Sequence, residues 1–147
     1  MVQDRSRDDV EGIVFPILPN HLERFFEGGK SVFVKFVGRR DFSDKIQCGS
    51  KLFFYKSKGN KEVVGEARIV EVGTGTVDEA LARFGDDLFL TRPELEEYAN
   101  NRKSRRMLVL VLKDAKKYRT PLRLDKGLTM AGQYMTRAMY HKLSVGG

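Results

Sequence analysis

Two short helices with threonine caps divide a chain that is otherwise patterned as β-strands. Thr76 precedes Glu79 and Thr91 precedes Glu94, and a threonine followed three positions later by a glutamate is the pattern of a helix capping box. Apolar and β-branched runs typical of strands lie on both sides of these helices. Strands, then helices, then strands again favour a small twisted sheet or an open barrel with flanking helices. We therefore expect an α+β fold.

Before the capped helices, strands are expected at 10–18, 31–38 and 63–72, and the segment 48–56 is expected to be a turn that leads into another strand. The last two are separated by turn residues at 58–61 and therefore predict a hairpin. Asn20, followed by Glu23 and by Gly28-Gly29, predicts a short capped helix between the first two strands.

After the capped helices, the pattern predicts one buried strand and a basic edge. Residues 107–112 are an uninterrupted apolar run, which indicates a buried strand. Residues 114–124 are predicted to form a basic loop that enters a short edge strand. Residues 129–143 have mixed, helix-like spacing.

The length of 147 residues and a hydrophobic content of 41% predict a single domain, over 1–147, with a core of its own. The polar first residues, to about residue 9, are expected to be loose. The sequence has no apolar run of bilayer length and no signal-peptide pattern, so we expect a cytoplasmic protein. One cysteine, Cys48, and two histidines provide no zinc-ligand set, and we expect neither a metal nor another cofactor.

Charge is distributed unevenly along the chain. Residues 1–98 hold 15 Lys and Arg against 18 Asp and Glu, whereas residues 99–147 hold 12 against 2, a net charge of +10. Such a basic segment attracts polyanions, because each phosphate contact releases condensed counterions. An ion-paired, solvated surface of the thermophile type is the alternative, but its charges are mixed rather than segregated. Nucleic acid is the expected partner.

Two groups of residues are the predicted phosphate contacts. The first lies at the end of the second capped helix and comprises Arg102, Lys103, Arg105 and Arg106. The second surrounds a tyrosine suited to stacking and comprises Lys116, Lys117, Tyr118 and Arg119. Favourable charge at a helix C-terminus accounts by itself for two of the first four. A core position at the barrel edge is the alternative for Tyr118.

Lys35 is the only charged residue inside the apolar run 31–38. Burial of an unpaired ammonium group is costly, so a lysine there has a partner, opens onto a pocket or alternates outward to solvent. Glu66 lies in a nearby predicted strand, and a Lys35–Glu66 pair across the sheet would be either structural or catalytic.

Several of these segments resemble the PUA-like superfold, whose relatives include the ASCH, EVE and YTH domains. The resemblance is carried by Val32–Lys35, Gly49–Ser57, Val64–Ile69 and the return strand at 118–124. The whole chain is similar to a small archaeal family of that superfold, including the helix with Thr91, Glu94 and Tyr98 and the segment 129–134.

This resemblance implies an open β-barrel of five or six mostly antiparallel strands with flanking helices, and a cleft that takes RNA or a modified nucleobase. The matching positions are Lys35, Tyr55, Lys56 and Ser57 on the strands, and Thr129, Gly132 and Tyr134 at the cleft rim. EVE and YTH pockets use tryptophan cages, but this chain has no Trp. Stacking would therefore fall to a phenylalanine or to one of three tyrosines, Tyr55, Tyr118 and Tyr134.

Three functions are compatible with these patterns. The favoured one is a module that binds RNA or a modified nucleotide through its basic C-terminal third and a cleft around Lys35 and Tyr55. The first alternative is an ASCH-like amidohydrolase or ribonuclease that uses Lys35, Glu66 and Thr129, although the lysine-threonine-arginine signature of ASCH domains is absent from the early strand. The second alternative is an interaction domain that docks on the ribosome or on an acidic protein.

Overall fold

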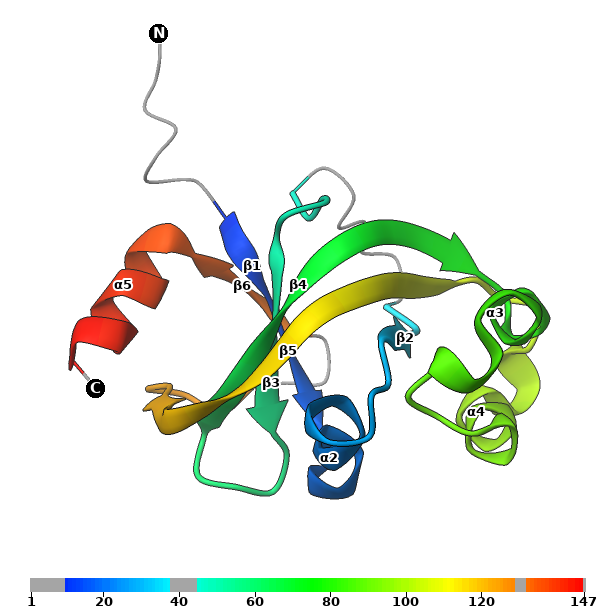
Figure 1. The fold of residues 1–147 in the computed structure, drawn as a ribbon, viewed down its shortest axis with the longest axis horizontal. Coiled ribbons are helices and arrows are strands. Elements are labelled where there is room, and N and C mark those ends of the chain that lie inside the picture. The colour runs from blue at the N-terminus through cyan, green and yellow to red at the C-terminus, as the bar shows by residue number, and fades with distance from the viewer. Residues whose placement is uncertain (1–9, 38–44, 129–131, 147) are drawn as a thin grey trace, which may run out of the picture.

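The computed structural model describes residues 10–37, 45–128 and 132–146. Its centre is one strongly curved six-stranded sheet with the strand order β2-β5-β4-β3-β1-β6 (Figure 1). The strands are β1 (Val10–Ile17), β2 (Val32–Lys35), β3 (Lys51–Lys56), β4 (Glu62–Gly75), β5 (Met107–Arg123) and β6 (Gln133–Thr136). The helices are α2 (Pro19–Phe26), α3 (Val77–Phe84), α4 (Arg92–Ala99) and α5 (Arg137–Gly146), with short 3-10 turns η1 (Gly85–Asp87) and η2 (Asn100–Arg102).

The sheet is mixed and open. Strand β1 runs parallel to β3, and the other neighbouring strands are antiparallel. Strands β2 and β6 lie at opposite edges, so the curved sheet does not close. This arrangement confirms the predicted α+β class and the open barrel with flanking helices. None of the helices in the described ranges is long and apolar enough to cross a membrane.

Local sequence signals account for α3 and α4. Each begins with a complete capping box: the hydroxyl oxygen of Thr76 accepts from the Glu79 amide at 3.2 Å, and that of Thr91 accepts from the Glu94 amide at 3.3 Å. The prediction for α2 was wrong about its start. Leu18 is the N-cap and makes no side-chain cap, because Pro19, whose fixed φ suits the first helical turn, starts the helix before Asn20.

Strand β5 is much longer than expected. Instead of a strand followed by a basic loop, it continues unbroken to Arg123 because β4 pairs with it from Gly75 at one end to Glu62 at the other. Strand β2 covers only Leu108–Val111 of its opposite edge. Beyond Val111, no strand in the described part of the chain pairs with that edge. The helix-like spacing noted at 129–143 corresponds to a helix only from Arg137 on, where α5 begins, whereas 133–136 form β6 against β1.

The sheet separates two apolar clusters, because successive side chains of a strand point to opposite faces. The larger cluster includes Ile13 and Phe15 and is covered by α2, α3 and α4. The smaller one includes Val14 and Phe53 and is covered by α5, which lies at the other end of the molecule in Figure 1. Five stacked rings, with neighbouring centroids 5.0–5.4 Å apart, run through the larger cluster in the order Phe15, Phe33, Phe89, Phe25 and Phe54.

Candidate nucleic-acid interface

The outer half of β5 carries four exposed cations, which we call the β5 strip: Lys116, Lys117, Arg119 and Arg123. Their side chains form no ion pair or hydrogen bond with any other described residue. Between the register pairs Gly65↔Lys117 and Val63↔Leu122, β5 has four residues and β4 has one, so β5 bulges around Arg119. The bulge contains Pro121, which has no amide proton to donate to a ladder. The β5 strip is therefore a row of uncompensated positive charge.

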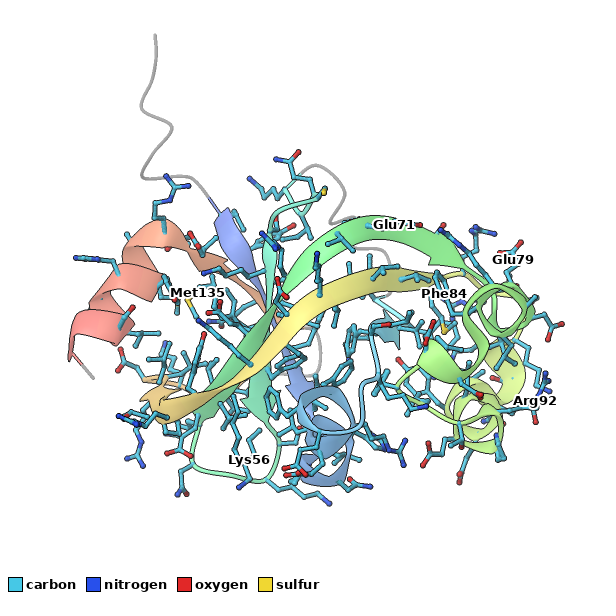
Figure 2. All side chains as sticks on the ribbon, viewed as in Figure 1. Lys56, Glu71, Glu79, Phe84, Arg92 and Met135 are labelled. Atoms are coloured by element: carbon cyan, nitrogen blue, oxygen red, sulfur yellow. The ribbon has the colours of Figure 1, made fainter. Side chains whose placement is uncertain are left out.

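The other predicted basic group, which we call the helix-end cluster, comprises Arg102, Lys103, Arg105 and Arg106. Arg102 donates to the Tyr98 carbonyl at 2.8 Å, and its guanidinium lies 4.2 Å from the centre of the Phe36 ring. Arg106 donates to Thr74 and pairs with Glu79 at 3.0 Å. Glu79 lies at the end of the molecule that holds α3 and α4 (Figure 2). Two of the four cations therefore serve the fold, and only Lys103 and Arg105 remain without described side-chain partners.

A buried carboxylate lies beneath the β5 strip. Glu66 is 7% exposed and faces Lys116 in the register, but its oxygens are occupied by other groups. Tyr118 donates its hydroxyl to Oε1 at 2.6 Å, Tyr140 does so at 3.4 Å, and Lys51 Nζ lies 3.3 Å from Oε2. These contacts compensate the buried charge, and they leave Lys116 unpaired.

The contacts around Glu66 also shift the pKa values of the side chains that make them. Burial raises the pKa of Tyr118 far above its ordinary value, and the hydrogen bond to Glu66 adds to the effect because it favours the neutral phenol. Burial, the largest single cause, lowers the pKa of Lys51. The charge of Glu66, the hydrogen bond to it and the nearby Tyr140 and Glu11 together outweigh burial, so the net pKa is raised. Tyr118 is half-buried and engaged here. The sequence alternative of a core position at the barrel edge therefore describes it better than a stacking position.

Lys35 is buried, 8% exposed, on the other side of the sheet. Its ammonium lies 5.5 Å from the centre of the Phe15 ring, and no described carboxylate pairs with it. Burial lowers its pKa. The predicted pair with Glu66 does not form. Lys35 lies beside Leu108 of β5 and Glu66 beside Lys116, eight residues further along, or about 26 Å at the usual rise of a strand.

The structure does not bring Lys35 and Tyr55 into one cleft. Tyr55 is 7% exposed in the smaller cluster beneath α5, where its hydroxyl accepts from the Leu128 amide at 3.4 Å. Lys35 contacts Phe15, which belongs to the larger cluster. The alternation of strand side chains thus places the two residues on opposite faces of the sheet.

The remaining residues of the predicted cleft are also divided. Lys56, which is exposed, and Ser57 follow Tyr55 at the end of β3. Gly132 and Tyr134 lie on the same side of the sheet as Lys35 instead. Tyr134 packs on the larger cluster, and a Cβ on Gly132 would come within 2.5 Å of the Phe15 ring. Thr129 lies outside the described residues.

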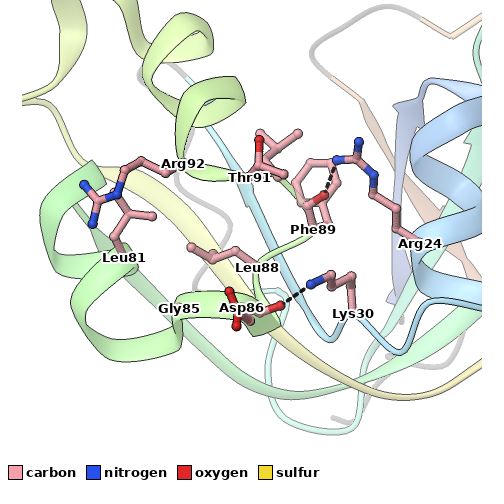
Figure 3. A pocket seen from close by; sticks show the side chains of 10 residues that line it. Arg24, Lys30, Leu81, Gly85, Asp86, Leu88, Phe89, Thr91 and Arg92 are labelled. Atoms are coloured by element: carbon pink, nitrogen blue, oxygen red, sulfur yellow. Dashed lines mark hydrogen bonds between the residues drawn. The ribbon is translucent and has the colours of Figure 1, made fainter.

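Sequence reasoning missed two cavities. One, of about 370 Å³, lies between α2 and the α3–α4 connection. Figure 3 shows that two of its cations are engaged: Arg24 donates to the Phe89 carbonyl and Lys30 to that of Asp86. Arg24 also holds Glu94 through two hydrogen bonds of 2.6 and 2.9 Å. The other cavity, of about 470 Å³, lies beside α5. The first is lined by residues that range from Arg24 to Arg92, so no local pattern indicates it. The second is lined by residues within 124–143, but it exists only because the segment after β5, β6 and α5 pack around one space. No group of three or more metal-ligating side chains occurs within the described ranges.

Comparison with solved structures identifies the class. The ASCH protein from Zymomonas mobilis has a TM-score of 0.74 at 19% identity, over 97% of this chain and 96% of that one. The N-terminal domain of McrB from Staphylothermus marinus has a TM-score of 0.56 at 15% identity, over the full length of both. A hypothetical protein from Leishmania major has a TM-score of 0.52 at 15% identity, over 95% and 96%. With the strand order, these likenesses establish a PUA-like open barrel.

Within that class, the chain belongs to the family described as "Domain of unknown function (DUF365)", whose model matches residues 10–137. No curated protein matches the sequence. The predicted relation to ASCH domains is thus confirmed for the fold.

Proposed function

We propose that this protein is a binding module for RNA, and that the β5 strip contacts the RNA phosphates. The observation that carries the proposal is that these four cations are exposed and unpaired along one strand edge. Protein–phosphate contacts require cations that are not already neutralised by the protein itself. The surrounding charge supports the same view, because residues 107–146 hold 8 Lys and Arg against 2 Asp, a net charge of +6.

The manner of binding differs from the one expected. Tyr55 and Tyr118 are engaged in the smaller cluster and are not free to stack on bases. We therefore assign the affinity chiefly to phosphate contacts along the β5 strip. Lys103 and Arg105 of the helix-end cluster contribute a weaker, separate patch. The region around Lys35 is not needed for this contact, because Lys35 is buried beside Leu108, in the half of β5 that the β5 strip does not reach.

A binding module is favoured over a hydrolase by the separation of Lys35 from Glu66. The hydrolase alternative needs a lysine and a carboxylate at one reacting atom, within hydrogen-bond reach of it. Glu66 is instead enclosed by Tyr118, Tyr140 and Lys51 on the opposite side of the sheet.

The test is fluorescence anisotropy with labelled single-stranded RNA, an RNA hairpin and a DNA duplex. Wild-type protein is expected to bind RNA and to lose affinity steeply between about 50 and about 200 mM salt. The variant with Lys116, Lys117, Arg119 and Arg123 all changed to Gln is expected to lose RNA binding while keeping the wild-type circular dichroism spectrum and melting temperature.

Two results would overturn the proposal. The first is an absence of RNA binding by the folded wild-type protein even at low salt. The second is retention of wild-type RNA affinity by the quadruple variant. If wild-type protein does not bind free RNA but sediments with purified ribosomes, it is an interaction domain for the ribosome instead.

A further inference from the structure

The cavity beside α5 has the size and lining of a small-ligand site. Its volume is about 470 Å³, within the range of roughly 300–1,000 Å³ that such pockets occupy. The lining comes from the segment after β5 (Leu124, Asp125, Lys126), from β6 (Gln133) and from α5 (Ala138, Met139, Lys142, Leu143). Three segments that are separate in the sequence therefore converge on it.

One part of the lining is apolar and packs on the smaller core cluster. Leu124 is 4% exposed and belongs to the smaller core cluster, against which Met139 and Leu143 pack. Such a surface accepts a flat apolar group, and a methionine side chain adapts well to an aromatic face. A nucleobase has such a face.

The other part of the lining is polar and unpaired. Lys126, Lys142 and Asp125 are exposed and form no ion pair with another described residue. The two ammonium groups suit a phosphate. An ionised carboxylate only accepts hydrogen bonds, whereas the Gln133 amide both donates and accepts. This combination fits a nucleotide whose base presents N–H donors, and guanine presents two adjacent donors on its Watson–Crick edge.

The cavity also continues the proposed RNA surface. Leu124, Asp125 and Lys126 directly follow Arg123, the last cation of the β5 strip. A strand of RNA lying along the β5 strip therefore reaches the cavity without leaving the protein surface. RNA bases that are unpaired and unstacked are those that proteins read most often in this way.

We propose that this cavity receives one unpaired guanine base of an RNA whose phosphates lie on the β5 strip. This rests on the proposed function, and it adds a preference for the base that the strip alone does not provide. The site is separate from three residues of the cleft that the family resemblance implies, because Lys35, Gly132 and Tyr134 lie on the larger-cluster side of the sheet. Tyr55 of that cleft lies in the smaller cluster, on the same side as the cavity.

The test uses methyl NMR of the full chain labelled at its methionine methyl groups. GMP, UMP and inorganic phosphate are titrated separately. GMP is expected to shift the Met139 methyl strongly through the ring current of the base, UMP weakly, and phosphate hardly at all. Met107, which is buried in the larger cluster, is the internal control and should not respond.

Variants then connect the pocket to RNA. Ala138→Phe fills the cavity from an exposed position, and Ala82→Phe makes the same change on the exposed surface of α3 as a matched control. Wild type is expected to prefer an RNA with unpaired guanines over one with unpaired uridines by about tenfold, within the range that one stacked base contributes. Ala138→Phe and Asp125→Asn should each abolish most of this preference, and Ala82→Phe should keep it.

The outcomes separate the two proposals. If the quadruple Gln variant of the β5 strip loses RNA binding but GMP still shifts Met139, both stand. Equal Met139 shifts with GMP, UMP and phosphate, or an unchanged guanine preference in Ala138→Phe, would overturn the pocket while the proposed RNA contact survives. A Met139 response to GMP in a protein that does not bind RNA would overturn the RNA module and reassign the cavity to a free nucleotide.

Discussion

The two ends of the molecule both carry basic residues, but they differ in the number of acidic residues around them. At the end formed by α3 and α4, residues 76–99 hold 7 Asp and Glu against 2 Arg, and Glu79 in this segment pairs with Arg106. At the end formed by the outer half of β5 and by α5, acids are scarce and the β5 strip has no described partners. The number of cations therefore says less about a binding surface than the supply of acids around them.

The largest expected effect is on RNA affinity. Lys116→Glu/Lys117→Glu reverses two free cations of the β5 strip, and Lys103→Glu/Arg105→Glu makes the same change of charge in the helix-end cluster. The strip variant should weaken RNA binding roughly a hundredfold, since two phosphate contacts become repulsions, and the control less than about threefold. Titrations at matched salt measure both affinities. Equal losses would mean that the ends do not differ in function.

The next largest effect is on the stability of the fold, and it is expected in the helix-end cluster rather than in the β5 strip. Arg102→Ala removes the hydrogen bond to the Tyr98 carbonyl and the contact with Phe36, so we expect a loss of about 1–2 kcal/mol. Arg119→Ala removes an exposed, unpaired side chain and should stay within about 0.5 kcal/mol of wild type. Urea unfolding gives both values. A destabilised Arg119→Ala would show that the β5 strip also serves the fold.

The same contrast between paired and unpaired cations holds for two lysines inside the protein, Lys51 and Lys35. Lys51→Met leaves the buried Glu66 carboxylate without its cation and should destabilise the fold by about 1–2 kcal/mol. Lys35→Met removes a buried ammonium group that has no described carboxylate partner, and it should stabilise the fold by about 1 kcal/mol. Because the pKa of Lys35 is lowered in the folded state, wild-type stability gains from this group as pH rises towards the ordinary value of 10.5. Lys35→Met should lack that gain in unfolding experiments between neutral and alkaline pH. A destabilised Lys35→Met would indicate that Lys35 has a partner that matters.

The smallest expected effect is on the stability of the fold at acid pH. The hydrogen bond from Arg24, followed by that from the Thr91 amide, lowers the pKa of Glu94 to about 2. The stabilisation from this carboxylate is therefore complete above its ordinary pKa of 4.5 and is lost as pH falls through about 2. Both side chains are about a third exposed, so we expect only about 1 kcal/mol. Glu94→Gln should flatten the decline in melting temperature between pH 4.5 and 2, and an unchanged decline would contradict this assignment.

The amount that could be predicted differs between local and distant features. The capping boxes of α3 and α4 were predictable because Thr76 and Thr91 need only partners three residues away. The hairpin of β3 and β4 followed from its turn residues for the same reason. The continuation of β5 past residue 112 was not predictable, since its hydrogen bonds come from β4, some 40 to 60 residues earlier in the sequence.

The candidate site follows the same rule. The presence of basic residues at 102–106 and 116–119 was visible in the sequence, but the engagement of Arg106 depends on Thr74 and Glu79, and that of Tyr118 on Glu66. The separation of Lys35 from Glu66 depends on where β2 pairs along β5. The cavity beside α5 needs three segments to meet and had no signal in any one of them.

By itself, the sequence determined the α+β class, the helix starts at Thr76 and Thr91 and the concentration of positive charge in the last third. These depend on composition, on periodicity and on contacts between near neighbours. Only the tertiary structure decided which cations remain free, which face of the sheet each strand residue occupies and where a cavity opens. The physical reason is that an ion pair, a register and a cavity each require groups that folding alone brings together, and one residue of shift in a strand moves a side chain to the other face.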